Sequence, residues 1–261
     1  MISAGCAREV SVNFKVDIFD VRQLAKQGLW LVTAECAFDI AMLFLRVQEF
    51  YESANEAFVG RAFTILDYMR WYSLNLSDEK SFTYPNDFEG FNLPRGAIDA
   101  CAAAGIPDPN PYDLTMARIT AGVLARQGGD YYLIGARKGD DANIAHEVAH
   151  GMFYLVPDYR ARSTLLVDEL AQEHRDELFG VLRKQGYSDR VQTDEAQAYL
   201  ATGLFQDILH LEHLRHPFMR LFATYRKKLI GPKRARVKKV VTPAVPIPAV
   251  APATLLEVKA A

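Results

Sequence analysis

Cysteine is scarce in this chain. The 261 residues include only Cys6, Cys36 and Cys101, an odd number with no Cys-x-x-Cys pair. Such a set gives no basis for the disulfide framework that small secreted domains usually need. We therefore expect the chain to reside in a reducing compartment.

The sequence also lacks the marks of secretion and of membrane insertion. Residues 1–11 have neither the cationic start nor the apolar core of a secretory signal. The most apolar stretch, residues 28–45, contains Glu35 and Asp39, so a buried amphipathic helix is favoured over a membrane span. Together with the cysteine content, these absences predict a cytoplasmic protein without a membrane span.

Acidic residues are absent from one segment. Between Tyr225 and Val240 there is no acid, and eight residues are lysine or arginine. The formal charge of the chain is −2, and Glu257 and Lys259 cancel, so residues 1–224 carry −10. An acidic body argues against a nucleic-acid-binding core. The basic segment is either a solubilising linker or a site for an acidic partner, nucleic acid or a membrane surface.

Hydrophobic periodicity predicts a mostly helical chain with a few short strands. We expect helices over residues 29–52, 63–76, 112–126, 141–156, 157–184, 190–211 and 217–229. We expect strands at residues 8–19, 82–84 and 131–135, with residues 86–94 in a connecting loop rather than a substrate-binding rim. The fold class is therefore α+β and predominantly helical.

One pentapeptide carries a specific chemical pattern: His146-Glu147-Val148-Ala149-His150. Histidines four residues apart lie on one face of a helix, so both imidazoles can reach one metal ion at ~2.0–2.1 Å. The intervening glutamate projects near that metal and can act as a general base. The flanking residues are uncharged, as a buried metal-binding helix requires: Ile144, Ala145, Val148, Ala149, Met152 and Phe153. The pattern predicts one Zn²⁺ ion, with Glu147 as the base.

A catalytic zinc needs a third protein ligand. The downstream acids that can supply it are Asp168, Glu169, Glu173, Glu177, Asp194 and Glu195. Glu195 is favoured because small residues, Ala196, Ala198 and Ala201, would let its helix approach the metal helix closely. Glu169 and Glu173 remain the alternatives.

The pentapeptide followed by Glu195-x-x-Ala198 resembles the gluzincin clan of zinc metallopeptidases, including the lethal-factor type. The resemblance covers residues 130–205, less than a third of the chain. It implies a zincin-like catalytic core in which His146, His150 and Glu195 are the metal ligands. The metzincin pattern does not fit, because Phe153 and Val156 occupy the positions of its glycine and third histidine.

Gluzincins also use a tyrosine or histidine to stabilise the oxyanion. The resemblance therefore implies a catalytic role for Tyr187 or Tyr199. The three histidines His210, His213 and His216 are expected at a solvated helix end rather than in a second metal site.

The sequence thus predicts a single domain over residues 1–229, with a helical part at 1–120 and a metal-binding core at 121–229. Residues 230–261 are basic and then rich in proline and alanine, so a disordered tail is expected. We expect a metallopeptidase acting on a peptide or protein, with the strand before the metal helix offering its edge to the substrate. The alternatives are a catalytically silent interaction protein and a zinc hydrolase of a non-peptide amide.

Overall fold

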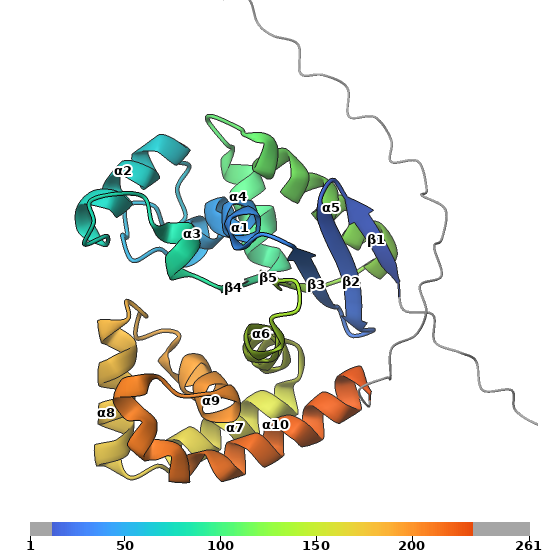
Figure 1. Cartoon of the computed structure of the whole chain (residues 1–261). Helices are drawn as coiled ribbons and strands as arrows, with labels where there is room; N and C mark the ends of the chain where they lie inside the picture. Colours follow the sequence, from blue (N-terminus) through green and yellow to red (C-terminus); the bar gives the residue numbers. More distant parts are fainter. Residues whose placement is uncertain (1–11, 232–261) are drawn as a thin grey trace, which may run out of the picture.

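Five strands form one mixed sheet with the order β1-β2-β3-β5-β4 (Figure 1). A computed structural model describes residues 12–231 of the chain. The strands are β1 Asn13–Val16, β2 Phe19–Ala25, β3 Leu29–Ala34, β4 Gly90–Pro94 and β5 Tyr132–Arg137. Strands β1, β2 and β3 are antiparallel, β5 runs parallel to β3, and β4 runs antiparallel to β5.

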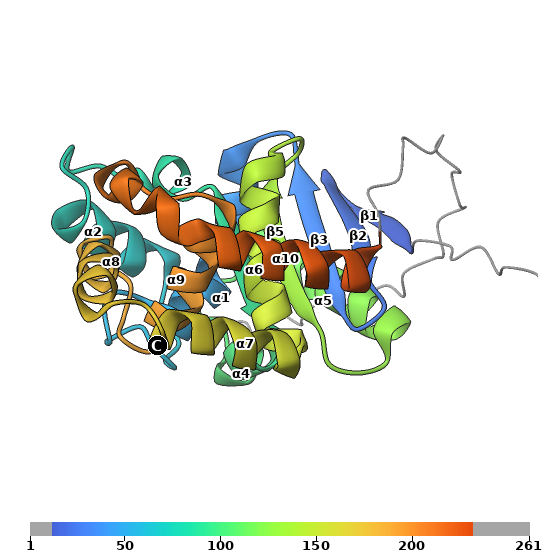
Figure 2. The ribbon, with the colours of Figure 1, turned by 90° about the horizontal axis from the view of Figure 1, so that it is seen from below.

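Helices cover both faces of this sheet (Figure 1). On one side lie α1 Ala37–Glu52, α2 Ile65–Asn75, α3 Tyr84–Asp87, α4 Arg95–Ala104 and α5 Pro111–Gln127. On the other lie α6 Asp141–Leu155, α7 Pro157–Asp168, α8 Gln172–Lys184, α9 Gln192–Thr202, the 3₁₀ segment η1 Gln206–Leu214 and α10 Arg215–Ile230. Figure 2 shows α10 crossing α6 beneath the sheet. The predicted α+β, predominantly helical class is therefore confirmed.

The helix expected over residues 29–52 is wrong in its first part. Residues Leu29–Ala34 form the central strand β3, and the helix α1 begins only at Ala37. Both faces of β3 are buried, so its side chains do not alternate between apolar and polar. A short apolar run of this kind cannot be distinguished from a buried helix by periodicity alone.

Two of the expected strands also differ from the observed ones. The strand expected at residues 82–84 is absent, because Tyr84 begins α3, and the strand lies instead at Gly90–Pro94. The strand expected over residues 8–19 is divided into β1 and β2 by a turn in which Asp17 has a φ of 51°; residues 8–11 lie outside the described part. The part expected to be helical, 1–120, thus supplies four of the five strands.

The C-terminal helices are shorter than periodicity suggested. The helix expected over residues 157–184 is two helices, α7 and α8, and the one expected over 190–211 ends at Thr202 and gives way to η1. None of the helices within residues 12–231 combines the length and apolar character that crossing a membrane requires. Most of the predicted tail, residues 232–261, lies outside the described residues.

Candidate metal centre

Helix α6 carries the pentapeptide, and its ends follow from local sequence. The Asp140 side chain accepts a hydrogen bond from the Asn143 backbone N–H at 3.2 Å, as an N-cap residue should. Asp141 adds an acid in the first turn, where the helix dipole favours it. Pro157 follows the C-terminal end and begins α7.

One face of α6 packs tightly against the sheet. Val148 and Met152 are fully buried in a cluster that includes Leu29 of β3 and Tyr132 of β5. A Cβ atom on Gly151 would lie 2.4 Å from a methyl group of Leu29, so a larger residue here would require the buried Leu29 side chain to shift. This packing fixes the rotation of α6 about its axis.

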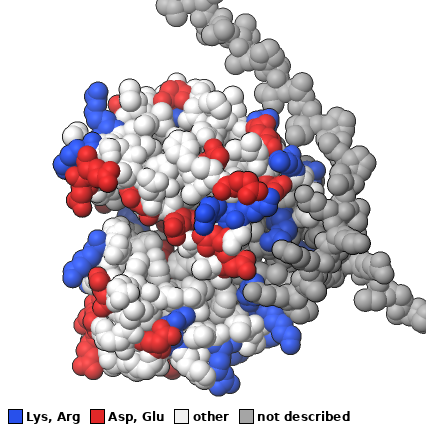
Figure 3. Space-filling view, in the orientation of Figure 1, with Lys and Arg blue, Asp and Glu red and all other residues white. Residues whose placement is uncertain are grey.

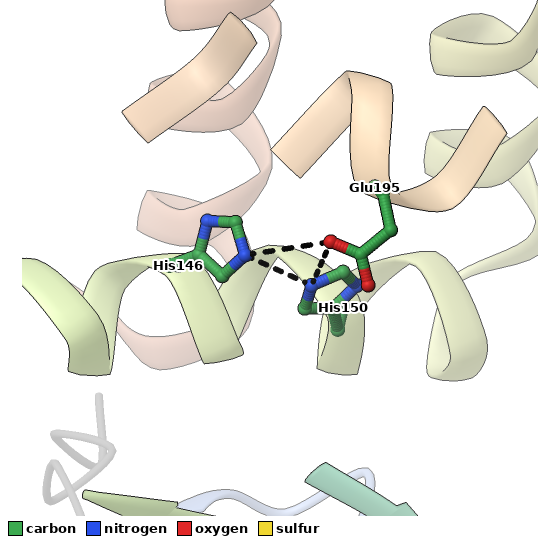
Figure 4. A group of neighbouring side chains, drawn as sticks. All are labelled: His146, His150 and Glu195. Carbon is green, nitrogen blue, oxygen red and sulfur yellow. Dashed lines mark hydrogen bonds and ion pairs between the residues drawn. The ribbon is translucent and has the colours of Figure 1, made fainter. Parts of the chain in front are cut away.

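The two histidines meet Glu195 of α9 (Figure 4). The Nε2 atoms of His146 and His150 are 3.2 Å apart. The Oε2 atom of Glu195 lies 3.8 Å from the first Nε2 and 3.6 Å from the second. Ligand atoms at ~2.1 Å from a tetrahedral metal ion lie roughly 3.4 Å from one another. The three atoms therefore have a separation that suits one shared cation.

The Oε2 atom of Glu195 is an orphan within the described structure. This atom is buried and has no hydrogen-bond partner there, and the whole residue is only 8 % exposed. A buried acceptor without a partner costs free energy, roughly 1–3 kcal/mol. A cation held between Glu195 and the two histidines would remove that cost, so the donor set and its geometry fit a metal ion.

Small residues bring α9 to α6, as the sequence suggested. Ala196 and Ala198 are completely buried, and Ala201 is 6 % exposed. Of the other acids considered as ligands, Asp194 lies beside the Nδ1 of His150, and the rest lie elsewhere. Asp168 and Glu173 are largely exposed, Glu177 pairs with His210, and Glu169 caps the end of α7. Among residues 12–231, the group with metal-ligand spacing is His146, His150 and Glu195.

Each histidine is oriented by a partner on its Nδ1 atom. The Nδ1 of His150 lies 3.0 Å from the Oδ1 of Asp194, and the Nδ1 of His146 lies 3.1 Å from the Thr202 hydroxyl. Burial alone would lower the pKa of His150, but the charges of Asp194 and Glu195 outweigh it and raise this pKa well above its ordinary value. The site therefore has a negative potential that favours a cation.

A hydrogen-bonded chain extends behind Asp194. The Gln197 amide donates to the Asp194 carboxylate at 2.9 Å and accepts from the Tyr159 hydroxyl at 2.6 Å. Gln197 is fully buried and Tyr159 is 1 % exposed. The chain joins α6, α9 and α7, so the orientation of His150 depends on three helices. Such partners of metal ligands fix ring orientation and tautomer.

Glu147 is held by strand β4. The Asn92 side-chain amide donates to the Oε2 atom of Glu147 at 2.8 Å, and Tyr132 donates in turn to the Asn92 oxygen. A Cβ atom on Gly90 would lie 2.2 Å from the Oε1 atom of Glu147, so glycine makes room for this carboxylate. Burial raises the pKa of Glu147, as a proton acceptor near neutral pH requires.

Asn92 and Gly90 were not recognised from the sequence, although both lie in the segment 86–94 whose possible role as a rim was considered. The expectation that the strand directly before α6 offers its edge to a substrate was also wrong. Strand β5 is enclosed between β3 and β4, so the sheet edge beside α6 belongs to β4. Only the pairing of strands distant in sequence decides which one is the edge.

The two predicted tyrosines lie together beside the triad. The hydroxyl groups of Tyr187 and Tyr199 are 3.0 Å apart, and the Tyr199 ring centroid lies 4.4 Å from that of His146. Burial and the charge of Glu195 raise the pKa of both phenols, so both hydroxyls carry their protons at neutral pH. One hydroxyl donates to the other in this pair, so the accepting hydroxyl keeps a proton that it can donate at this end of the site.

The predicted histidine cluster lies in and just beyond η1. His210 pairs with Glu177 at 3.0 Å, and the Nδ1 of His213 lies 3.0 Å from the His210 carbonyl. Both histidines are exposed, and neither belongs to a metal-ligand group among the described residues.

A comparison of the chain with models of known protein families, with curated proteins and with solved structures finds no match.

Proposed function

We propose that this protein is a zinc-dependent metallopeptidase with a gluzincin-like arrangement on a zincin-like core. One observation carries the proposal: two histidine Nε2 atoms and the orphan Oε2 of Glu195 converge beside a buried, hydrogen-bonded Glu147. Two imidazoles and one carboxylate form a donor set that suits catalytic zinc.

The residues around the centre have separate roles in this proposal. His146, His150 and Glu195 hold one zinc ion, which polarises a carbonyl and lowers the pKa of water when bound. The Oε2 of Glu147 accepts from Asn92, so Oε1 remains available to take a proton and pass it to the leaving amine. Tyr187 or Tyr199 donates its hydroxyl proton in a hydrogen bond to the developing oxyanion.

The free edge of β4 provides a place for an extended peptide. The Arg95 N–H donates to the Tyr131 carbonyl at 3.0 Å, which fixes which residues of β4 face β5. Because backbone groups alternate along a strand, Gly90 and Asn92 direct their own N–H and C=O groups away from β5. These are the two residues that contact Glu147. A peptide paired with this edge would therefore pass beside the proposed base.

Replacement of Glu147 by glutamine tests the proposal. The variant should keep one zinc per chain but lose hydrolysis of a mixed peptide library, because the amide cannot accept the proton. Glu56→Gln, at an exposed site beyond α1, is the control and should retain activity. Cleavage by Glu147→Gln at the wild-type rate would contradict the mechanism. A wild-type chain that binds zinc but cleaves no peptide would favour an interaction protein or a hydrolase of another amide.

A further inference from the structure

A groove lies between α7 and α10, on the side of the molecule away from the sheet. Figure 2 shows the two helices side by side there, and the hollow between them has a volume of about 540 Å³. A second hollow, of about 280 Å³, shares Leu166 and Pro217 with the first and is lined by Leu214. From Leu214 to Lys228 the groove follows α10 over about 21 Å of helix. It is therefore long enough to receive several turns of another helix.

The floor of this groove is apolar and exposed to solvent. Leu165 of α7 is 56 % exposed, and Leu166, Pro217 and Leu221 continue the apolar surface between the helices. Exposed apolar side chains that are scattered singly need no partner, but leucines gathered in one hollow are typical of a binding site. The floor thus offers contacts to apolar side chains of a ligand.

The rim of the groove is basic on both sides. Its cations are Arg162 of α7 and Arg220 and Lys228 of α10. Helix α10 itself contains five lysine and arginine residues and no acid. Lysine and arginine side chains are visible along the lower right of Figure 3, where α10 lies in Figure 1. The groove therefore has a positive potential, although the body of the protein is acidic.

The cations that α10 contributes to the rim lack acidic partners. Among the ion pairs of residues 12–231, none involves Arg220 or Lys228. Asp158, an acid beside them, already accepts from Arg162 at 3.2 Å and from the Tyr225 hydroxyl. Glu169 lines only the second hollow, toward the opposite end. Two positive charges next to an apolar floor thus remain available to a ligand.

This arrangement separates a peptide from the other acidic partners that a basic helix can bind. Phe218 and Tyr225, on the apolar face of α10, are buried in the protein, so that face cannot enter a bilayer. The exposed leucines lie in a hollow, which a flat membrane surface does not fill. Nucleic acid would contact the cations through its phosphates and leave the leucines uncovered. A helix with apolar residues on one side and acids beside them satisfies both features.

We propose that the groove between α7 and α10 binds an acidic amphipathic helix of a partner protein. Apolar side chains of that helix, one turn apart, cover Leu165 and Leu221, and flanking carboxylates pair with Arg220 and Lys228. None of the residues that line the groove belongs to the proposed metal centre. The binding is therefore independent of whether the protein cleaves peptides.

The test uses the full chain and a fluorescently labelled helical peptide of about 15 residues. The peptide has leucines at helical spacing and glutamates beside them, and two companion peptides carry glutamine for glutamate or serine for leucine. Arg220→Glu and Leu165→Asn change the groove. The matched controls are Lys227→Glu and Leu66→Asn, two exposed residues of α10 and α2 outside it. Fluorescence anisotropy at about 0.15 M salt measures Kd, and the melting temperature establishes that each variant is folded.

The wild type and both controls should bind the acidic peptide with Kd values within about twofold, because exposed charges away from the contact are screened. Arg220→Glu should weaken binding about tenfold, since it places like charges together. Leu165→Asn should weaken it by a similar factor through the loss of apolar contact. The glutamine and serine peptides should each bind the wild type about tenfold more weakly than the acidic one.

Equal losses in Arg220→Glu and Lys227→Glu would overturn the inference, because the attraction would then come from the basic surface in general. Equal binding of the glutamate and glutamine peptides would also overturn it. Vesicles that contain phosphatidylserine and a double-stranded oligonucleotide are tested in parallel. A wild type that binds either of these but not the acidic peptide would assign the basic surface to a membrane or to nucleic acid instead. Absence of binding to the peptide would in every case refute the proposed occupant.

Discussion

The Nδ1 atom of His150 lies 3.0 Å from the Oδ1 atom of Asp194, while the Oε2 of the next residue, Glu195, lies 3.6 Å from the Nε2 atom of the same ring. Two adjacent acids in the first turn of α9 thus contact both nitrogens of one buried imidazole. Asp194 fixes the tautomer by accepting from Nδ1, which leaves Nε2 free to bind a metal.

Asp194→Asn should weaken zinc binding by about 10- to 100-fold, because the neutral amide holds the imidazole less firmly and makes it a weaker ligand. Competition with a chromophoric chelator measures the change. Asp207→Asn, at an exposed position of η1, is the control and should bind zinc as the wild type does. An unchanged zinc affinity in Asp194→Asn would mean that the contact is structural only.

Glu195→Ala should lower the zinc content below one ion per chain, because two histidines alone do not retain a catalytic zinc. The rise in melting temperature on adding zinc should also be lost, since a ligand stabilises only the state that binds it. Glu169→Ala and Glu173→Ala should keep both properties. Metal analysis and thermal unfolding provide the readouts, and full zinc content in Glu195→Ala would assign the third ligand elsewhere.

Gly90→Ala should impair catalysis and leave zinc bound. The added methyl group would lie 2.2 Å from the Oε1 of Glu147, so the carboxylate must move away from its place beside Asn92. A displacement near 1 Å of a reacting group costs about 100-fold in rate. Gly96→Ala is the matched control, because a Cβ at that position meets nothing within 4 Å. Equal kcat values for the two variants would argue against the positioning of Glu147 by β4.

Glu49 makes the stability of the fold depend on pH. Burial raises the pKa of Glu49 from 4.5 to about 7, despite hydrogen bonds from Ser53, Tyr68 and Tyr84. The folded state therefore keeps a proton that the unfolded state releases, so stability is full below pH 4.5 and falls as the pH rises through 7. Glu49→Gln should remove about 2–3 kcal/mol of that decline. Chemical unfolding at pH 4.5 and pH 8 measures it, with Glu56→Gln as the control; the same decline in Glu49→Gln would contradict the assignment.

The sequence by itself determined the features that depend on neighbouring residues. The spacing of His146 and His150 places both on one helix face whatever surrounds them, because the geometry of an α-helix is local. The Asp140 cap and the proline after α6 also act within a few residues, so the ends of this helix were predictable. The small residues of α9 correctly indicated that this helix packs closely.

The tertiary structure decided what depends on chain segments far apart. Strand β5 becomes an interior strand only because β4, about forty residues earlier, pairs with it. That pairing brings Asn92 and Gly90 to Glu147. Among the acids after the motif, the small residues of α9 favoured Glu195, but only the packing of that helix against α6 brings its carboxylate to the two histidines. The sequence thus determined the two histidines and the proposed base on one helix, and the packing of α9 and β4 supplied their partners.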